Sequence, residues 1–227
     1  MVQGKRVIII ANGDLENLNF YRELVGKDDF VVCVNGGSAH ALVLGMKPAL
    51  VVGDLDSLDP GDRHKLEAMG PRFIKYPSAK DKSDLEIALD HAVAMQPAEI
   101  IIIGALGGKR TDHAFINLLL LNIPHKEGIR ARIVDHTQDI CLVDGEMEIG
   151  GSPGDYLSLF SLTAETKDIF TEGLRYPLQG ESLFFASTLG LSNELTASKA
   201  KVKIGSGLLL VIKTKSVTPV RSNNREL

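Results

Sequence analysis

The sequence lacks the features of membrane, secreted and nucleic-acid-binding proteins. Its apolar runs, such as those at residues 100–103 and 118–121, are far shorter than the roughly 20 residues that a membrane span requires. No N-terminal apolar segment is followed by a small-residue cleavage site. Twenty-nine acidic residues against 25 basic ones give a net charge of -4, so no overall basic field would attract nucleic acid. These absences predict a cytoplasmic protein that binds neither membranes nor nucleic acids.

Cysteine and tryptophan are scarce as well. The chain has no tryptophan and only two cysteines. Cys33 and Cys141 each stand in an apolar, strand-like run, where a cysteine usually serves as a small buried hydrophobic residue. Two isolated cysteines fit no common metal-binding spacing. We therefore expect neither a disulfide nor a cysteine-bound metal.

The first part of the chain alternates between two hydrophobic periods. Short β-branched runs are separated by segments in which apolar residues recur with helical spacing. The expected strands span residues 7–11, 30–34, 49–52, 72–76, 100–103 and 131–134. Helix boundaries are marked by residues that suit caps and stops: Pro60, Gly45, Gly70 and the capping box of Ser83 and Glu86. This order predicts an α/β fold with a mostly parallel sheet flanked by helices.

The helical period disappears after residue 134. Short, often alternating segments follow, separated by Gly, Asn and Ser turns. The expected strands here span residues 138–143, 155–163, 174–178, 182–186, 201–204 and 208–213. We expect a C-terminal all-β sandwich or barrel, and two domains that span residues 1–137 and 138–227.

Charged residues follow the predicted strands in the first part of the sequence. The carboxyl ends of parallel strands meet at one edge of a sheet, where ligands bind in open α/β folds. Six aspartates fall in the loops at that edge: Asp14, Asp54, Asp56, Asp81, Asp84 and Asp112. Carboxylates from separate loops repel one another unless a cation lies among them. The sequence therefore favours a cation site at this edge.

Asp54 and Asp56 are the strongest metal candidates. Residues two apart in an extended segment project to the same face, so both carboxylates can approach one ion. Magnesium prefers such oxygen ligands, with water and phosphate oxygens completing its shell. A strand-ending turn explains the pattern equally well, with Asp59 capping a helix that begins at Pro60.

The loops that carry the aspartates also carry cations. Asp81 and Asp84 alone are explained as solvated charges in the first turn of a helix. The same loops, however, contain Lys80, Lys82, Lys109 and Arg110, which suit an anion. A metal ion together with a polyphosphate would satisfy both signs of charge.

A glycine-rich stretch follows the predicted strand at 100–103. The stretch 104–108 resembles a phosphate-binding loop, and the helix behind it would offer free backbone amides to an anion. It is not a Walker A motif, because its glycines are separated by three residues instead of four and Arg110 replaces the Ser or Thr after the lysine. His113 is explained either as a capped structural residue or, beside Arg110 and Asp112, as part of a site.

In their combined order these motifs resemble one known family, the bacterial thiamine pyrophosphokinases. The similarity runs from about residue 9 to residue 212, and the order of the motifs is far more specific than any one of them. The matching segments are Gly53-Asp54-Leu55-Asp56-Ser57, Lys80 to Ala88, Arg110-Thr111-Asp112-His113 with Asn117, Gly173 to Leu178, Leu191 to Leu195 and Gly207 to Ile212. The later segments resemble the thiamine-binding β domain of the family.

The resemblance implies a reaction and a set of site residues. The reaction is the magnesium-dependent transfer of a diphosphate from ATP to the hydroxyl of thiamine, which releases AMP. A homodimer is implied, with each site between the α/β domain of one subunit and the β domain of the other. Residues of the acidic metal and catalytic cluster would be Asp54, Asp56, Asp81 and Asp84, of which Asp54, Asp56 and Asp81 bind the metal. Lys82, Arg110, Asp112 and His113 would lie at the ATP triphosphate, and Ser192 and Asn193 would contact thiamine.

The sequence departs from the family pattern at one position of this cluster. The family usually has an aspartate where Asn35 precedes two glycines, so this chain carries one negative charge fewer. Without tryptophan, any stacking on thiamine needs a residue such as Tyr176. Two other functions remain open: a metal-dependent nucleotide-sugar transferase, and a non-catalytic sensor of nucleotide or thiamine.

Overall fold

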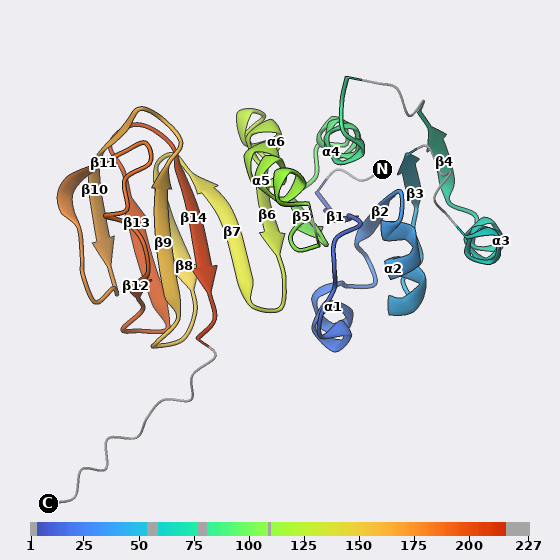
Figure 1. Ribbon diagram of the computed structural model, residues 1–227, viewed down its shortest axis with the longest axis horizontal. Coiled ribbons are helices and arrows are strands. Elements are labelled where there is room, and N and C mark those ends of the chain that lie inside the picture. The colour runs from blue at the N-terminus through green and yellow to red at the C-terminus, as the bar shows by residue number, and fades with distance from the viewer. Residues whose placement is uncertain (1–3, 54–58, 77–80, 109, 217–227) are drawn as a thin grey trace, which may run out of the picture. The chain divides into compact units, whose positions relative to one another are not determined.

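The computed structural model describes residues 4–53, 59–76, 81–108 and 110–216. The chain divides into two compact units, Met1–His136 and Thr137–Leu227. Figure 1 shows helices throughout the first unit and strands throughout the second. No helix in the described ranges is long and apolar enough to cross a membrane.

The first unit is built on a parallel sheet, as the sequence predicts. Its strands are β1 (Arg6–Ile10), β2 (Phe30–Val34), β3 (Leu50–Gly53), β4 (Arg72–Lys75), β5 (Glu99–Ile103) and β6 (Arg130–Val134). They lie in the order β6-β5-β1-β2-β3-β4, and each neighbouring pair is parallel. Residues 7–10 and 100–103 are fully buried, as expected of strands covered on both faces.

Helices cover both faces of this sheet. They are α1 (Leu18–Leu24), α2 (Gly37–Leu44), α3 (Pro60–Met69), α4 (Asp84–Ala94), α5 (Thr111–Leu120) and α6 (Asn122–Lys126). In Figure 1, α1, α2 and α3 lie on one face and α4, α5 and α6 on the other. The predicted boundaries of α3 and α4 are confirmed: the Asp59 carboxylate accepts from the Gly61 N–H at 2.8 Å, and the Ser83 hydroxyl accepts from the Glu86 N–H at 3.1 Å.

The strand order reverses direction at β1. The chain moves outward from β1 through β2 and β3 to β4, and then returns to add β5 and β6 on the opposite side of β1. Loops that leave β1 and β5 therefore diverge to opposite faces of the sheet, which opens a crevice at the carboxyl ends of these two strands. The fold thus places its binding crevice between the loops after β1 and β5.

The second unit consists of antiparallel strands in two layers. One layer has the order β12 (Asn193–Glu194), β9 (Tyr156–Ser161), β14 (Leu209–Thr214), β7 (Gln138–Val143). The other has the order β11 (Gln179–Phe184), β10 (Glu165–Glu172), β13 (Lys199–Lys203), β8 (Glu146–Gly150). Buried side chains from both layers, such as Leu159 of β9 and Val202 of β13, form one hydrophobic cluster. The predicted all-β sandwich is confirmed.

Some details of the second unit differ from the sequence prediction. Residues 174–178 do not form a strand; they contribute a single bridge, from Leu174 to Leu195. Pro177 has no N–H to donate, so it cannot continue a ladder. Conversely, β8 and β10 are strands that the sequence analysis does not predict. Cys33 and Cys141 are both buried, as the sequence predicts for cysteines in apolar strands.

Candidate active site

A cavity of about 800 Å³ occupies the crevice between the loops after β1 and β5. Its wall is formed by residues 11–13 after β1, Val34 and Asn35 of β2 and its loop, residues 82–85 at the start of α4, and the segment from Gly104 to Asn117 that leads into α5. All of these segments leave the carboxyl edge of the parallel sheet. The cavity therefore lies where open α/β sheets bind ligands.

The first residues of the loops after β1 and β5 meet at the base of the cavity, below the point where the loops diverge. The Gly13 N–H donates to the Gly104 carbonyl at 2.7 Å, and His40 Nε2 lies 2.9 Å from the Gly13 carbonyl. A Cβ at Gly13 would lie 2.5 Å from the Gly104 carbonyl oxygen, and one at Gly104 would lie 2.6 Å from the Ala11 carbonyl oxygen. Only glycine fits at both positions, which brings two backbones together at the base of the cavity.

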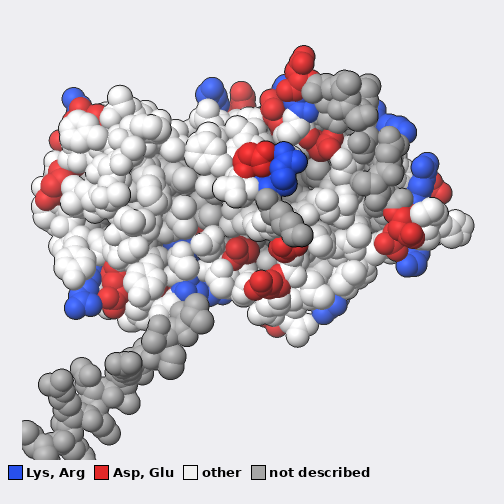
Figure 2. Space-filling model, in the orientation of Figure 1, with Lys and Arg blue, Asp and Glu red and all other residues white. Residues whose placement is uncertain are grey.

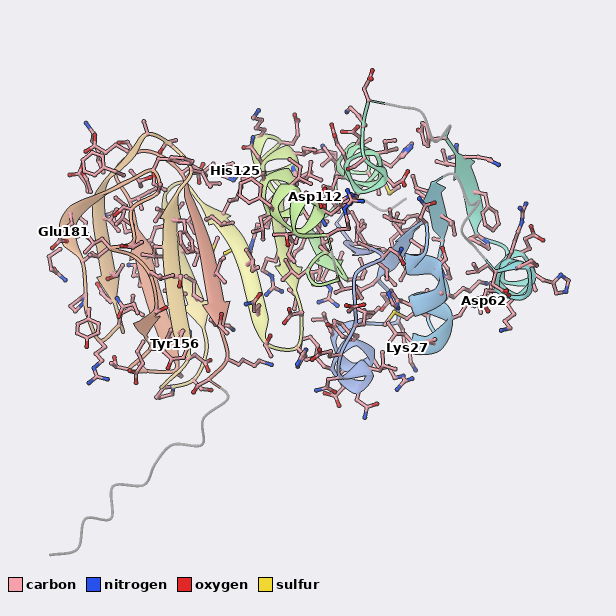
Figure 3. The ribbon with its side chains drawn as sticks, in the orientation of Figure 1. Lys27, Asp62, Asp112, His125, Tyr156 and Glu181 are labelled. Carbon is pink, nitrogen blue, oxygen red and sulfur yellow. The ribbon has the colours of Figure 1, made fainter. Side chains whose placement is uncertain are left out.

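The glycine-rich loop leads directly into the N-terminus of α5. Asn117 of α5 holds the loop by donating from Nδ2 to the Ala105 carbonyl at 2.8 Å. The free backbone N–H groups and positive dipole of a helix N-terminus favour an anion. Arg110, Asp112 and His113 stand at this helix start and all line the cavity, so the structure brings these three predicted residues together. Figure 3 shows Asp112 at the start of α5.

Arg110 and Asp112 form a forked ion pair. Arg110 Nε donates to Asp112 Oδ1 at 2.9 Å, and Arg110 Nη2 to Asp112 Oδ2 at 2.6 Å. These hydrogen bonds from Arg110 hold the pKa of the Asp112 carboxyl far below its usual range. Both side chains are exposed, and Figure 2 shows acidic and basic groups side by side on this part of the surface. Asp112 is thus an ionised partner that orients the guanidinium.

The start of α4 brings two further predicted residues to the cavity wall. Asp84, the first residue of the helix, lines the cavity, as does Lys82. The Lys82 ammonium turns back along α4 and donates to Asp90 at 2.6 Å, with Glu86 at 3.4 Å. Asp81 is exposed and does not line the cavity. Lys82 must therefore break its ion pair with Asp90 of α4 before it can bind a ligand.

Several predicted residues cannot be placed. Asp54 and Asp56, the main metal candidates, lie outside the described residues, as do Lys80 and Lys109. Within the described part of the chain, no three His, Cys, Asp or Glu side chains group closely enough to hold a metal ion. β3 ends at Gly53, so the Asp54-Leu55-Asp56 motif begins directly after a strand of the same sheet edge. The metal assignment remains a prediction.

Two asparagines also line the cavity: Asn12, which is not among the predicted site residues, and Asn35, which the family resemblance places at a position of the acidic cluster. Asn12 follows β1 and Asn35 follows β2, and both line the cavity. The Asn35 amide Nδ2 donates to the Asp84 carboxylate, across 49 positions of sequence. A usable signal was present in the sequence, since each asparagine precedes a glycine at the carboxyl end of a predicted strand, where the acidic candidates were also found.

In the second unit, the structure joins the two motifs that resemble a thiamine-binding domain. The side chain of Asn193 clasps the backbone of Tyr176: its Oδ1 accepts from the Tyr176 N–H at 3.1 Å and its Nδ2 donates to the Tyr176 carbonyl at 2.6 Å. Arg175 lies with Cζ 5.8 Å from the centre of the Tyr176 ring and pairs with Glu194 at 2.9 Å. Ser192 lies in the left-handed region at φ 57°. Asn193 thus fixes the backbone from which the exposed Tyr176 side chain projects.

Comparison with known protein families agrees with both units. Residues 21–133 match the family model described as the thiamin pyrophosphokinase catalytic domain. Residues 143–209 match the model described as the thiamin pyrophosphokinase vitamin B1 binding domain. The first match contains most of the cavity wall, and the second contains the cluster around Tyr176.

Individual relatives are similar over nearly the whole chain. A thiamine pyrophosphokinase of Bacillus subtilis (strain 168) is 31% identical over 215 residues, which cover 92% of this chain and 99% of the relative. A crystal structure of the B. subtilis enzyme superposes with a TM-score of 0.84 at 29% identity, covering 94% of this chain and all of that one. A crystal structure of the Geobacillus thermodenitrificans enzyme gives a TM-score of 0.81 at 31% identity, covering 94% and 99%. This chain therefore belongs to the thiamine pyrophosphokinase family.

Proposed function

We propose that this protein transfers a diphosphate from ATP to the hydroxyl of thiamine, producing thiamine diphosphate and AMP. In this reaction the thiamine oxygen bonds to the β-phosphorus of ATP, and the bond from that phosphorus to the oxygen bridging the α- and β-phosphates breaks. The observation that carries the proposal is the cavity between β1 and β5, which lies in the part of the chain that matches the catalytic domain of the family. The two alternative functions, a nucleotide-sugar transferase and a non-catalytic sensor, are not favoured by the family matches.

The ATP triphosphate would lie against the glycine-rich loop and the N-terminus of α5. Diphosphate transfer asks the protein chiefly to align the reacting groups and to neutralise negative charge. Arg110 and His113 lie at the helix start, where their side chains would bind the phosphate oxygens. Asp112 would orient the Arg110 guanidinium through its two hydrogen bonds. Lys82 would exchange its bond to Asp90 for a phosphate oxygen.

The acidic residues would hold magnesium. Carboxylate oxygens are the protein ligands that this ion prefers, so Asp54, Asp56 and Asp81 suit it chemically. The bound ion would neutralise charge on the transferred diphosphate. Asp84 lines the cavity and would belong to the same catalytic cluster. One of the carboxylates, Asp81 or Asp54, would accept the proton of the thiamine hydroxyl.

Thiamine would be bound by the second unit. Ser192 and Asn193 are the predicted contacts, and the exposed ring of Tyr176 adds a flat surface for stacking on an aromatic heterocycle. Both polar atoms of the Asn193 amide hydrogen bond to the Tyr176 backbone, which supports a role for Asn193 in positioning Tyr176 for thiamine. We expect the protein to act as a homodimer in the cytoplasm.

An assay of AMP release tests the function. Purified protein with ATP, magnesium and thiamine should form equal amounts of AMP and thiamine diphosphate, and omission of thiamine should abolish both. Release of ADP in place of AMP would contradict the diphosphate transfer. Binding of both substrates without product would indicate the sensor, and turnover only with a sugar nucleotide would indicate the transferase.

The metal ligands are tested by substitution. Asp54→Asn and Asp56→Asn should each lower kcat by about a hundredfold or more, because each removes a charge that stabilises the transition state. Circular dichroism should show an unchanged fold, since asparagine has nearly the same size and shape as aspartate. Near-normal turnover of either variant at limiting magnesium would refute the metal assignment.

A further inference from the structure

Asn35 is the point at which three loops of the cavity edge meet. It follows β2, its side chain reaches Asp84 at the start of α4, and it packs against Gly53 at the end of β3. It also lines the cavity itself. The residue thus contacts the beginning of the segment that carries Asp54 and Asp56, as well as a carboxylate in the cavity wall.

The backbone of Asn35 is fixed in an uncommon conformation. Its φ of 46° lies in the left-handed region, which asparagine tolerates better than most residues. Its N–H donates to the Val52 carbonyl of β3 at 2.9 Å, and its carbonyl accepts from the Ser38 N–H of α2 at 3.0 Å. These bonds to two neighbouring elements fix the backbone of Asn35 at the carboxyl edge of the sheet.

The two ends of the side-chain amide face different neighbours. Nδ2 donates to Asp84, and Oδ1 lies so close to Gly53 that a Cβ at position 53 would collide with it. This orientation of the amide is the favourable one, because a carboxylate only accepts hydrogen bonds and would repel the amide oxygen. An aspartate at position 35 could offer Asp84 no donor at neutral pH and would add a like charge.

We propose that Asn35 is a positioning residue for catalysis, which holds the Asp84 carboxylate in the cavity by donating a hydrogen bond from its amide. This inference rests on the proposed function, and it assigns to this chain a donor at a position where the family pattern has a charge. The role is separate from metal binding, since it needs the Nδ2 donor of Asn35 and not its oxygen. Loss of the donor should change the rate of the chemical step more than the affinity for thiamine.

Asn35→Gly tests this role with a matched control. Glycine keeps the left-handed backbone and removes only the side chain. Because misplacement of a reacting group by about 1 Å can cost about a hundredfold, we expect kcat to fall by about tenfold to a hundredfold, with the KM for thiamine unchanged. Asn17→Gly is the control, because Asn17 is also left-handed, at φ 53°, and is exposed outside the cavity. Equal kcat values for the two variants would overturn the proposal.

A double-mutant cycle tests the hydrogen bond without relying on activity. In metal-free protein at pH 8, Asn35→Asp should lower Tm by about 3 °C or more, because two carboxylates then face each other. Adding Asp84→Asn to this variant reverses donor and acceptor, and should recover most of the loss. Additive changes in Tm would overturn the proposed pair.

The two experiments separate this inference from the proposed function. If wild-type protein released no AMP, the proposed function would fail while the Tm cycle could still demonstrate the pair. If wild-type protein were active and the cycle additive, the positioning role would fail while the proposed function stood.

Discussion

At the scale of single residues, the two units orient the residues of the proposed sites by different kinds of contact. In the cavity, Asp112 orients Arg110 by charge, and Asn35 orients Asp84 by an amide donor. In the second unit, Asn193 orients Tyr176 by binding its backbone at both the N–H and the carbonyl. In each case one polar side chain orients another residue. Substitution of the first side chain should therefore change binding or turnover through the position of the second.

Comparing Asn193 with Tyr176 tests this indirect role. Asn193→Ala removes three side-chain hydrogen bonds, two with the Tyr176 backbone and one accepted from the Glu194 N–H. It should lower the free energy of unfolding by about 1–2 kcal/mol and also weaken thiamine binding. Tyr176→Ala should weaken thiamine binding with little change in stability, because its ring is 66% exposed. Calorimetry with thiamine and urea unfolding measure the two effects. An Asn193→Ala variant with normal thiamine affinity would exclude a role for the Asn193 hydrogen bonds in binding.

At the scale of elements, helix α3 depends on its N-cap. Asp59 accepts from the backbone N–H of Gly61, and Pro60 fixes the first helical residue. Asp59→Ala should therefore lower the free energy of unfolding by about 1 kcal/mol, which is about 2–4 °C in Tm for a protein of this size. Asn is an equally good cap, so Asp59→Asn should retain most of the stability. An equal loss in both variants would assign the effect to the charge of Asp59 instead of the cap.

The elements that could be predicted are those with strong local signals. Strands β1 and β5 are continuous apolar runs, and the caps of α3 and α4 are short-range patterns, so periodicity and spacing identify them. β10 was missed because its alternation is interrupted: its pairing with β11 shifts register between Thr166 and Ile169, and Asp168 between them has φ 52°. A register shift depends on the partner strand, which no local pattern reveals.

Part of the cavity wall could be predicted for similar reasons. Arg110, Asp112, His113 and Asp84 line the cavity. Each follows a predicted strand or begins a predicted helix at the edge where ligands bind in open α/β sheets, and this is the local signal by which the sequence singles them out. The clasp of Tyr176 by Asn193 and the bond from Asn35 to Asp84 join residues that are 17 and 49 positions apart. Only the folded chain brings such pairs together, so no local sequence pattern predicts these hydrogen bonds.

At the scale of the whole molecule, the core of the first unit contains two ionisable groups that burial keeps neutral. Burial raises the pKa of the Cys33 thiol from 9.0 to about 12, and that of the Tyr21 hydroxyl from 10.0 to about 12. Both residues belong to one hydrophobic cluster on the sheet. Their protons are therefore released at lower pH in the unfolded chain than in the folded one.

Alkaline unfolding should reveal these groups. The stability that they contribute is complete below pH 9 and is lost as pH rises towards 12, because the unfolded chain ionises first. Urea unfolding across this range should show a steeper loss in wild-type protein than in a Cys33→Ala, Tyr21→Phe variant, which starts less stable but has a flatter profile. Tyr156→Phe, at an exposed tyrosine, is the control. Parallel profiles for all three proteins would contradict the prediction.

The expected homodimer can be tested by mixing inactive variants. If each site takes its ATP-binding residues from one subunit and its thiamine-binding residues from the other, a subunit with Asp54→Asn and one with Tyr176→Ala together form one intact site. Random exchange of subunits should then restore about a quarter of the wild-type activity. No recovery after confirmed exchange would place both sets of residues of a site on the same subunit.

The central position of β1 in the sheet also has a consequence for synthesis on the ribosome. This strand is made first, yet its fully apolar run pairs on one side with β2 and on the other with β5, where Ile10 lies beside Ile103. One edge of β1 therefore stays uncovered while the intervening part of the chain emerges, and such an edge invites aggregation. Nascent chains stalled before residue 103 should depend on chaperones, whereas longer ones can close the sheet and, in the same step, assemble the base of the cavity from Gly13 and Gly104.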